Sequence, residues 1–166
     1  MSEETSAVAA VKDDAKKSSL SPELIGENIS LLARTGNGLS FAYVRFELHG
    51  KPIQDLDALE SFPNLRYVDV SENALVNISG ISHLEYILSL DVHGNQIATV
   101  PASIDKRKYL QHANFSKNKI HTWDVLRWPL LSWLNLNGMI QFSRIHFSRK
   151  SLDSIETGRF FRVGPR

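Results

Sequence analysis

The sequence predicts an α/β solenoid of short repeats, and three observations lead to this fold class. Three eleven-residue segments share one pattern of apolar positions, and they recur every 22 or 23 residues. The stretches between them, such as 53–65, carry an apolar residue at every third place. The first pattern is typical of a short strand with one inward face, and the second suits helical or 3₁₀ turns on the opposite side. A single copy cannot bury its apolar face, so the copies must stack.

The three copies read LRYVDVSENAL at 65–75, ILSLDVHGNQI at 87–97 and LQHANFSKNKI at 110–120. They match L-x-x-L-x-L-x-x-N-x-L, the pattern of a leucine-rich repeat. A weaker copy precedes them and an incomplete one follows, so we predict leucine-rich repeats over 39–138. The apolar places of the weaker copy are Tyr43, Phe46, Leu48 and Ile53, with Lys51 in the asparagine place, and the last copy has Leu131, Leu134 and Leu136, with Met139 in that place.

An asparagine ends each strand segment of the full copies, at Asn73, Asn95 and Asn118. Its side-chain amide can bond main-chain groups of an irregular turn that would otherwise lack partners. We therefore predict a structural role in the repeat turns for these three residues.

The segment before the repeats is predicted to close the open end of the core. Residues 1–20 are polar and are predicted to form a disordered arm. Ser21-Pro22-Glu23 is a helix start, since serine caps, proline suits the first position and an acid faces the helix dipole. Ile25, Ile29 and Leu32 then form an apolar stripe, and Gly36-Asn37-Gly38 ends the helix. The sequence thus predicts a helical cap over 21–38.

Alternate strand positions are expected to face outward on a concave surface, in a central column with one column on each side. The central column is predicted to carry Glu47, Asp69, Asp91, Asn114 and Asn135. The residues that we expect to bind a protein partner are Arg45, Glu47, Tyr67, Asp69, Asp91, His93, His112 and Trp133. Aromatic and arginine side chains at the centre of such a surface are frequent anchors for a partner. Trp123 and Trp128 are predicted to pack in the core.

Catalysis and metal binding are not predicted. The chain has no cysteine, which excludes disulfides, cysteine zinc sites and thiol nucleophiles. The sequence contains no phosphate-binding glycine loop, no H-E-x-x-H and no G-x-S-x-G. Ser71 and Ser116 lie near histidines, but this repeat position commonly holds a structural serine. We therefore expect a non-enzymatic protein with no cofactor, no metal and no small-molecule substrate.

The charge is divided unevenly between the repeats and the tail. Residues 1–138 hold 13 basic and 16 acidic side chains, whereas residues 139–166 hold 6 and 2. The last 28 residues leave the repeat pattern and are predicted to form an irregular basic tail. The near-neutral total of +1 disfavours nucleic acid as a partner, and the basic run Lys106-Arg107-Lys108 is predicted to face solvent. No apolar run is long enough to span a membrane, so we expect a soluble intracellular protein.

The stretch SLLARTGNGLSFAYVRFEL at 30–48, followed by LRYVDVSENAL, is more specific than the repeat pattern alone. It resembles a family of leucine-rich-repeat proteins found in the radial spokes of motile cilia and sperm flagella, over about residues 29–138. That family is similar to a short-repeat group that includes a phosphatase regulator, an axonemal dynein light chain and the spliceosomal A-prime protein. Because the repeats stop at Gly138, where the family continues, the resemblance also implies a truncated form.

The resemblance implies a protein-binding scaffold of the axonemal radial spoke, in the cytoplasm and cytoskeleton of cilia and flagella, with other spoke proteins as partners. Two alternatives stay open. One is a cytosolic or nuclear adaptor of the phosphatase-regulator type, and the other is binding to an RNA particle through the basic tail.

Overall fold

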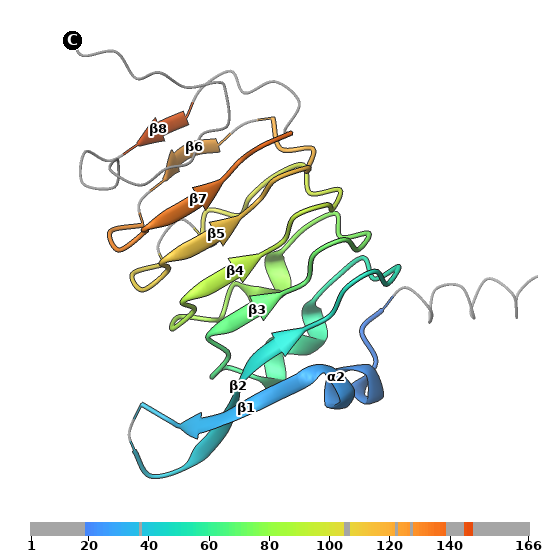
Figure 1. Cartoon of the computed structure of the whole chain (residues 1–166), viewed down its shortest axis with the longest axis vertical. Helices are drawn as coiled ribbons and strands as arrows, with labels where there is room; N and C mark the ends of the chain where they lie inside the picture. Colours follow the sequence, from blue (N-terminus) through green and yellow to red (C-terminus); the bar gives the residue numbers. More distant parts are fainter. Residues whose placement is uncertain are drawn as a thin grey trace, which may run out of the picture.

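The computed structural model describes residues 19–138, apart from 37, 105, 106, 122 and 127, and a short strand at 145–147. Five strands run parallel in one sheet: β2 (Phe41–Glu47), β3 (Tyr67–Asp69), β4 (Ser89–Asp91), β5 (His112–Asn114) and β7 (Trp133–Asn135). Figure 1 shows them stacked along the long axis of the molecule. The predicted leucine-rich-repeat solenoid is confirmed.

Two 3₁₀ helices lie on the opposite side of the core from the sheet. They are η1 (Asp57–Ser61) and η2 (Ser79–Ile81), and both appear behind the strands in Figure 1. The three-residue spacing of 53–65 predicts such turns, because side chains three residues apart superimpose along a 3₁₀ helix. Leu56, Leu59 and Leu65 from this segment are fully buried.

The sixth strand, β1 (Ile29–Arg34), changes the predicted cap. The helix α2 spans only Pro22–Asn28, and β1 then pairs antiparallel with β2, with Leu32 opposite Tyr43. The predicted helix start is correct, since the Ser21 side chain accepts a hydrogen bond from the Leu24 amide. The helix does not continue to residue 35, because pairing with β2 gives the backbone after Asn28 another set of partners.

The change from helix to strand alters which apolar residues are buried. Ile25 is 4% exposed, whereas Leu32 is 58% exposed, because the helical period on which the predicted stripe depends ends at Asn28. The Gly36-Asn37-Gly38 segment does not end a helix. Gly36 and Gly38 lie between β1 and β2, where Gly38 has φ +70° and donates from its amide to the Thr35 carbonyl, while Asn37 lies outside the described residues.

Two further positions differ from the prediction. Leu20, predicted in the disordered arm, is 4% exposed and packs in the core, while residues 1–18 lie outside the described residues. Tyr43, predicted in an apolar place of the first copy, is 48% exposed, and Val44 is buried instead. In β2 the side chains alternate strictly between the two faces, so Val44, Phe46 and Leu48 point inward together.

Arg107 is also a correction, because it is 6% exposed although its basic run is predicted to face solvent. Its Nη2 donates to the carbonyl oxygens of Ile81 and Ser82. Burial lowers the pKa of Arg107, and nearby Glu85 opposes this shift. The Arg107 guanidinium therefore links its own repeat to the preceding one through the main-chain carbonyls of Ile81 and Ser82. Lys108 is exposed, and Lys106 lies outside the described residues.

Trp128 packs in the core as predicted. It is 1% exposed, its ring stacks on Phe115 with centroids 6.1 Å apart, and its Nε1 donates to the Ile104 carbonyl at 2.8 Å. The side chain of Trp123, from the short strand β6 (Trp123–Leu126), lies outside the described residues. β6 pairs with β8 (Ile145–Phe147) in a separate two-stranded sheet.

The residue before the asparagine place has a left-handed backbone in every copy. These residues are Gly50, Glu72, Gly94, Lys117 and Gly138, with φ between 54° and 70°. Glycine adopts this conformation without the steric penalty that a Cβ brings. The recurrence includes Gly50 of the first copy and Gly138 of the last, which both precede a position that lacks the asparagine.

Lys117→Gly is accordingly expected to raise the free energy of unfolding by about 0.5–1 kcal/mol, because it relieves left-handed strain. Urea denaturation measures this change. Lys119→Gly is the matched control, since Lys119 is not among the residues with positive φ and should lose stability through added chain entropy. A loss of stability in both variants would contradict the strain argument.

Candidate protein-binding face

The outward side chains of β2, β3, β4, β5 and β7 form a surface that we call the strand face. The strand register aligns them in the columns that the repeats predict. One column contains Arg45, Tyr67, Ser89, His112 and Trp133, and the central one contains Glu47, Asp69, Asp91, Asn114 and Asn135. The structure therefore brings seven of the eight predicted binding residues into two adjacent columns, with His93 just beyond the end of β4.

The first strands carry a connected group of charged and aromatic side chains. Arg45 Nη1 donates to Glu47 Oε1 at 3.0 Å, and its guanidinium lies 5.4 Å from the centroid of the Tyr67 ring. Both charged side chains are more than 40% exposed, so the ion pair itself adds little stability. Its effect is to hold an arginine and a tyrosine, two frequent anchor residues, in fixed positions.

The central aspartates are engaged in local hydrogen bonds. Asp69 Oδ1 accepts from the Ser71 amide at 3.2 Å, and Asp91 Oδ1 accepts from the His93 amide at 3.0 Å. Asp91 also accepts from His93 Nδ1 and from Asn114 Nδ2, at 2.8 and 2.9 Å. These carboxylates therefore shape the strand ends while part of each side chain stays open to solvent.

The geometry near Ser71 differs from that of a catalytic triad. His49 Nδ1 lies 2.8 Å from Ser71 Oγ and 3.4 Å from Asp69 Oδ1, so one ring nitrogen faces both partners. A triad histidine uses one nitrogen for the serine and the other for the acid. Ser71 is also only 3% exposed, which leaves little room for a substrate. The arrangement is that of a turn network.

Metal ligation is not supported by the acidic column. Within the described ranges, no three histidine or acidic side chains converge closely enough to hold an ion. The closest approach is at His93, whose two ring nitrogens face Asp91 at 2.8 Å and Glu72 at 3.7 Å. This histidine links the ends of two repeats.

The last two strands, β5 and β7, present a less charged part of the strand face. His112 is exposed and Trp133 is partly exposed, and the two are register partners across β5 and β7. Backbone hydrogen bonds hold β7 beside the preceding repeat, and in one of them the Trp133 amide donates to the Gln111 carbonyl at 3.0 Å. A large ring on a fixed backbone can contact a partner at a small entropic cost.

The three repeat asparagines bond main-chain groups. Asn95 is 5% exposed, and its Nδ2 donates to the carbonyls of Val70, Val92 and His93 at 2.9, 2.9 and 3.2 Å, while its Oδ1 accepts from the Leu75 amide at 3.0 Å. Asn118 makes the equivalent four bonds. Asn73 makes the three equivalent donor bonds, and its Oδ1 accepts from the Lys51 amide. Each asparagine therefore joins its own turn to the preceding one.

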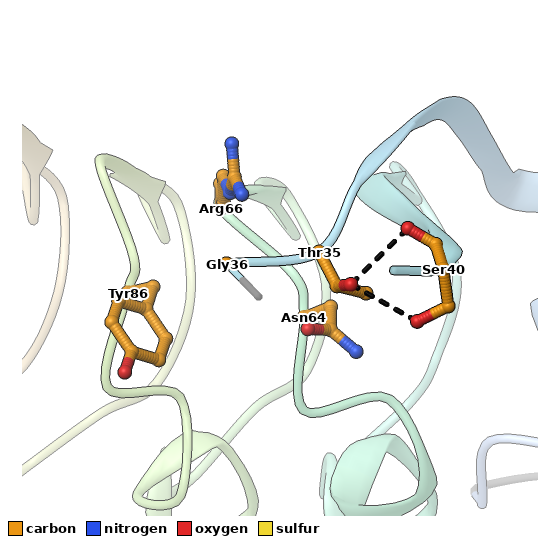
Figure 2. Close-up of a pocket in the computed structure, with 6 residues that line it drawn as sticks. All are labelled: Thr35, Gly36, Ser40, Asn64, Arg66 and Tyr86. Atoms are coloured by element: carbon orange, nitrogen blue, oxygen red, sulfur yellow. Dashed lines mark hydrogen bonds between the residues drawn. The ribbon is translucent and has the colours of Figure 1, made fainter. Parts of the chain in front are cut away.

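A hollow of about 400 Å³ lies beside the strand face, at the edge where the parallel strands begin. Figure 2 shows its lining, which comes from the β1–β2 turn and from the loops before β3 and β4. We call it the arginine pocket, and it is lined by Thr35, Gly36, Ser40, Asn64, Arg66 and Tyr86. The Thr35 hydroxyl bonds the carbonyl and hydroxyl of Ser40 at 3.1 and 3.0 Å, which holds the turn together.

Comparison with known proteins places the chain among leucine-rich-repeat proteins. It is 40% identical over 127 residues to leucine-rich repeat-containing protein 23 of Bos taurus, 39% over 119 residues to that of Homo sapiens and 36% over 123 residues to that of Mus musculus. The chain is a relative of leucine-rich repeat-containing protein 23. The matches cover 72–76% of this chain. No family model matches it.

The chain spans about one third of the length of the curated leucine-rich repeat-containing 23 proteins that it matches, between 34% and 35%. No helix in the part of the chain that the structure describes is long and apolar enough to cross a membrane. Like its relatives, the chain presents the repeat architecture typical of protein-binding scaffolds.

The arginine pocket was missed by the sequence analysis. Its residues come from three segments that are 20 or more positions apart, so no local motif joins them. A signal was nevertheless present, because the turn residues 35–40 and Asn64 fall at the same edge once the strands are stacked in register. The predicted helical cap over 21–38 concealed this, because it placed residues 29–35 in a helix and not in a strand of the sheet.

Proposed function

We propose that the chain is a non-enzymatic scaffold whose strand face binds a protein partner. The observation that carries this proposal is the register alignment of Arg45, Tyr67, His112 and Trp133 in one column next to the acidic column. A surface with partly exposed arginine and aromatic side chains has the composition of an interface centre. The local hydrogen bonds of the aspartates keep this surface in place before binding.

We further propose that this scaffold is a structural component of the axonemal radial spoke, located in the cytoskeleton of cilia and sperm flagella. The proposal rests on the similarity to leucine-rich repeat-containing protein 23 and on the specific stretch 30–48. Its partners would then be other radial spoke proteins, and its role would support ciliary and flagellar motility. No catalytic step is involved.

The test expresses a tagged chain in multiciliated cells and follows its position by fluorescence. We expect an axonemal signal from the unmodified chain and diffuse cytoplasm for the double variant Tyr67→Ala, Trp133→Ala. Each truncation of an interface anchor removes about 2 kcal/mol of binding free energy. Val76→Ala, Leu130→Ala is the matched control, since both side chains are about half exposed but lie away from the strand face.

Three outcomes decide between the proposals. Diffuse cytoplasm for the unmodified chain would contradict the radial spoke proposal. Equal axonemal signal from the unmodified chain and the double variant would contradict the role of the strand face. Loss of the axonemal signal from the control variant as well would show that localisation does not depend specifically on the strand face, which would contradict its role as the interface.

A further inference from the structure

The arginine pocket has a guanidinium with spare donors. Arg66 Nη2 donates to the Arg34 carbonyl at 3.3 Å, which fixes the side chain against the end of β1. A guanidinium has five N–H donors, so the others stay available to a ligand. Within the described part of the chain, no carboxylate lies within ion-pair distance of Arg66, in contrast to Arg45. The side chain is therefore fixed in position without being neutralised.

Arg66 is the residue of the arginine pocket that suits a carboxylate, and two further polar side chains line the hollow beside it. The Asn64 amide and the Tyr86 phenol can both donate hydrogen bonds, and they line the same hollow as Arg66. Figure 2 shows Asn64 and Tyr86 on either side of Gly36. Charge-assisted bonds from an arginine to a carboxylate are about twice as strong as neutral ones and can form in pairs.

Large apolar side chains extend the site on both flanks. Phe41, which follows Ser40 of the pocket, is 62% exposed, and the Arg34 guanidinium lies 5.6 Å from its ring centroid. On the other flank, Tyr86 is 54% exposed and stacks on the exposed ring of Tyr109, with centroids 5.7 Å apart. A free anion would leave these rings in water, whereas a protein segment would cover them.

The local charge balance favours an acidic occupant. Arg34 and Arg66 both lie at this edge, next to the pocket. Glu85, the neighbour of Tyr86, instead interacts electrostatically with the buried Arg107. A segment with acidic side chains complements this charge, and a basic segment would meet repulsion.

We propose that the arginine pocket and its aromatic flanks dock a segment of a partner protein that presents a glutamate or aspartate between apolar residues. The carboxylate accepts hydrogen bonds from Arg66, and the apolar neighbours pack on Phe41 and Tyr86. Arg66 and Tyr86 lie outside the parallel strands, whereas Phe41 is an outward residue of β2, so this site adjoins the strand face at the edge where the strands begin.

The experiment measures fluorescence anisotropy with the full chain and a short labelled peptide of repeated Glu-Leu-Ser triplets. We expect binding that weakens with added salt and that is about tenfold tighter than binding of the matched Gln-Leu-Ser peptide. Arg66→Gln should weaken binding of the acidic peptide about tenfold. The affinity of Arg66→Lys for the acidic peptide should lie between those of the original chain and Arg66→Gln, because lysine keeps the charge but lacks the planar guanidinium.

Lys51→Gln is the matched control, since it removes the same charge from an exposed position at the opposite end of β2. It should leave the affinity within about twofold, because two exposed charges separated by more than a Debye length are screened. Circular dichroism of each variant checks that the fold is retained, and the graded series from arginine through lysine keeps the test valid if Arg66→Gln unfolds.

Three results would overturn the proposal. They are no measurable binding of the acidic peptide, equal affinity for the acidic and the glutamine peptide, and equal weakening by Arg66→Gln and Lys51→Gln. A failure here leaves the strand face untouched, because the variants Tyr67→Ala and Trp133→Ala test that surface in separate measurements.

Discussion

Replacing Gly80 by alanine is expected to lower the free energy of unfolding by about 3 kcal/mol or more. Gly80 lies buried in η2, where a Cβ atom would come within 2.3 Å of the Leu56 carbonyl carbon and 2.5 Å of its oxygen. The obstructing atoms belong to the main chain, so no side-chain rotation can relieve the clash. The two repeats must move apart along the convex side, which opens the core between η1 and η2.

Urea denaturation of the original chain and of the Gly80→Ala variant measures this loss of stability. The midpoint of thermal unfolding of the variant should fall by roughly 6–12 °C. Gly26→Ala is the matched control, because nothing lies within 4 Å of its added Cβ in α2. Alanine in a helix interior should raise the stability by about 0.5–1 kcal/mol. An unfolding free energy of Gly80→Ala within 1 kcal/mol of the original would show that the repeats can separate at little cost.

Asn95→Ala is expected to be nearly as damaging, with a loss of about 3 kcal/mol. The substitution leaves the buried Leu75 amide without its acceptor, and it removes one of the two asparagine donors from each of the carbonyls of Val70 and Val92. A buried group that loses its partner costs more than the bond itself contributed, since no water replaces it. Because these bonds join two repeats, the loss should spread to the neighbouring turn.

Asn73→Ala is the graded comparison for this prediction. Asn73 makes the same kind of bonds but is only partly buried, so water can replace some of them and the expected loss is about 1 kcal/mol. Urea denaturation of both variants gives the difference. Equal losses at the two positions would contradict the argument from burial, and no loss at Asn95 would contradict the structural role of the asparagines.

The repeat core was predictable because its information is local and repeated. The alternation around Val68, Leu90 and Leu134 defines which side chains point inward, and the spacing of the copies aligns them. The columns of the strand face follow from the same register. For that reason Arg45, Tyr67, His112 and Trp133 could be placed together without coordinates.

The cap was not predictable in the same way. Ile29 and Leu32 suit a helical stripe as well as a strand, and only pairing with β2 decides between them. Arg107 is a similar case, since its burial depends on two carbonyls of the preceding repeat that lie 25 and 26 positions away. A local pattern contains no information about such partners.

The sequence by itself determined the leucine-rich-repeat solenoid, the inward positions and the alignment of the outward columns, because a period of 22 or 23 residues repeats the same local choice. The tertiary structure alone decided where α2 ends, that β1 becomes the sixth strand, and that turn residues meet Arg66 in a pocket. The physical reason is that backbone groups at the open end of a stack must find partners, and those partners belong to distant segments.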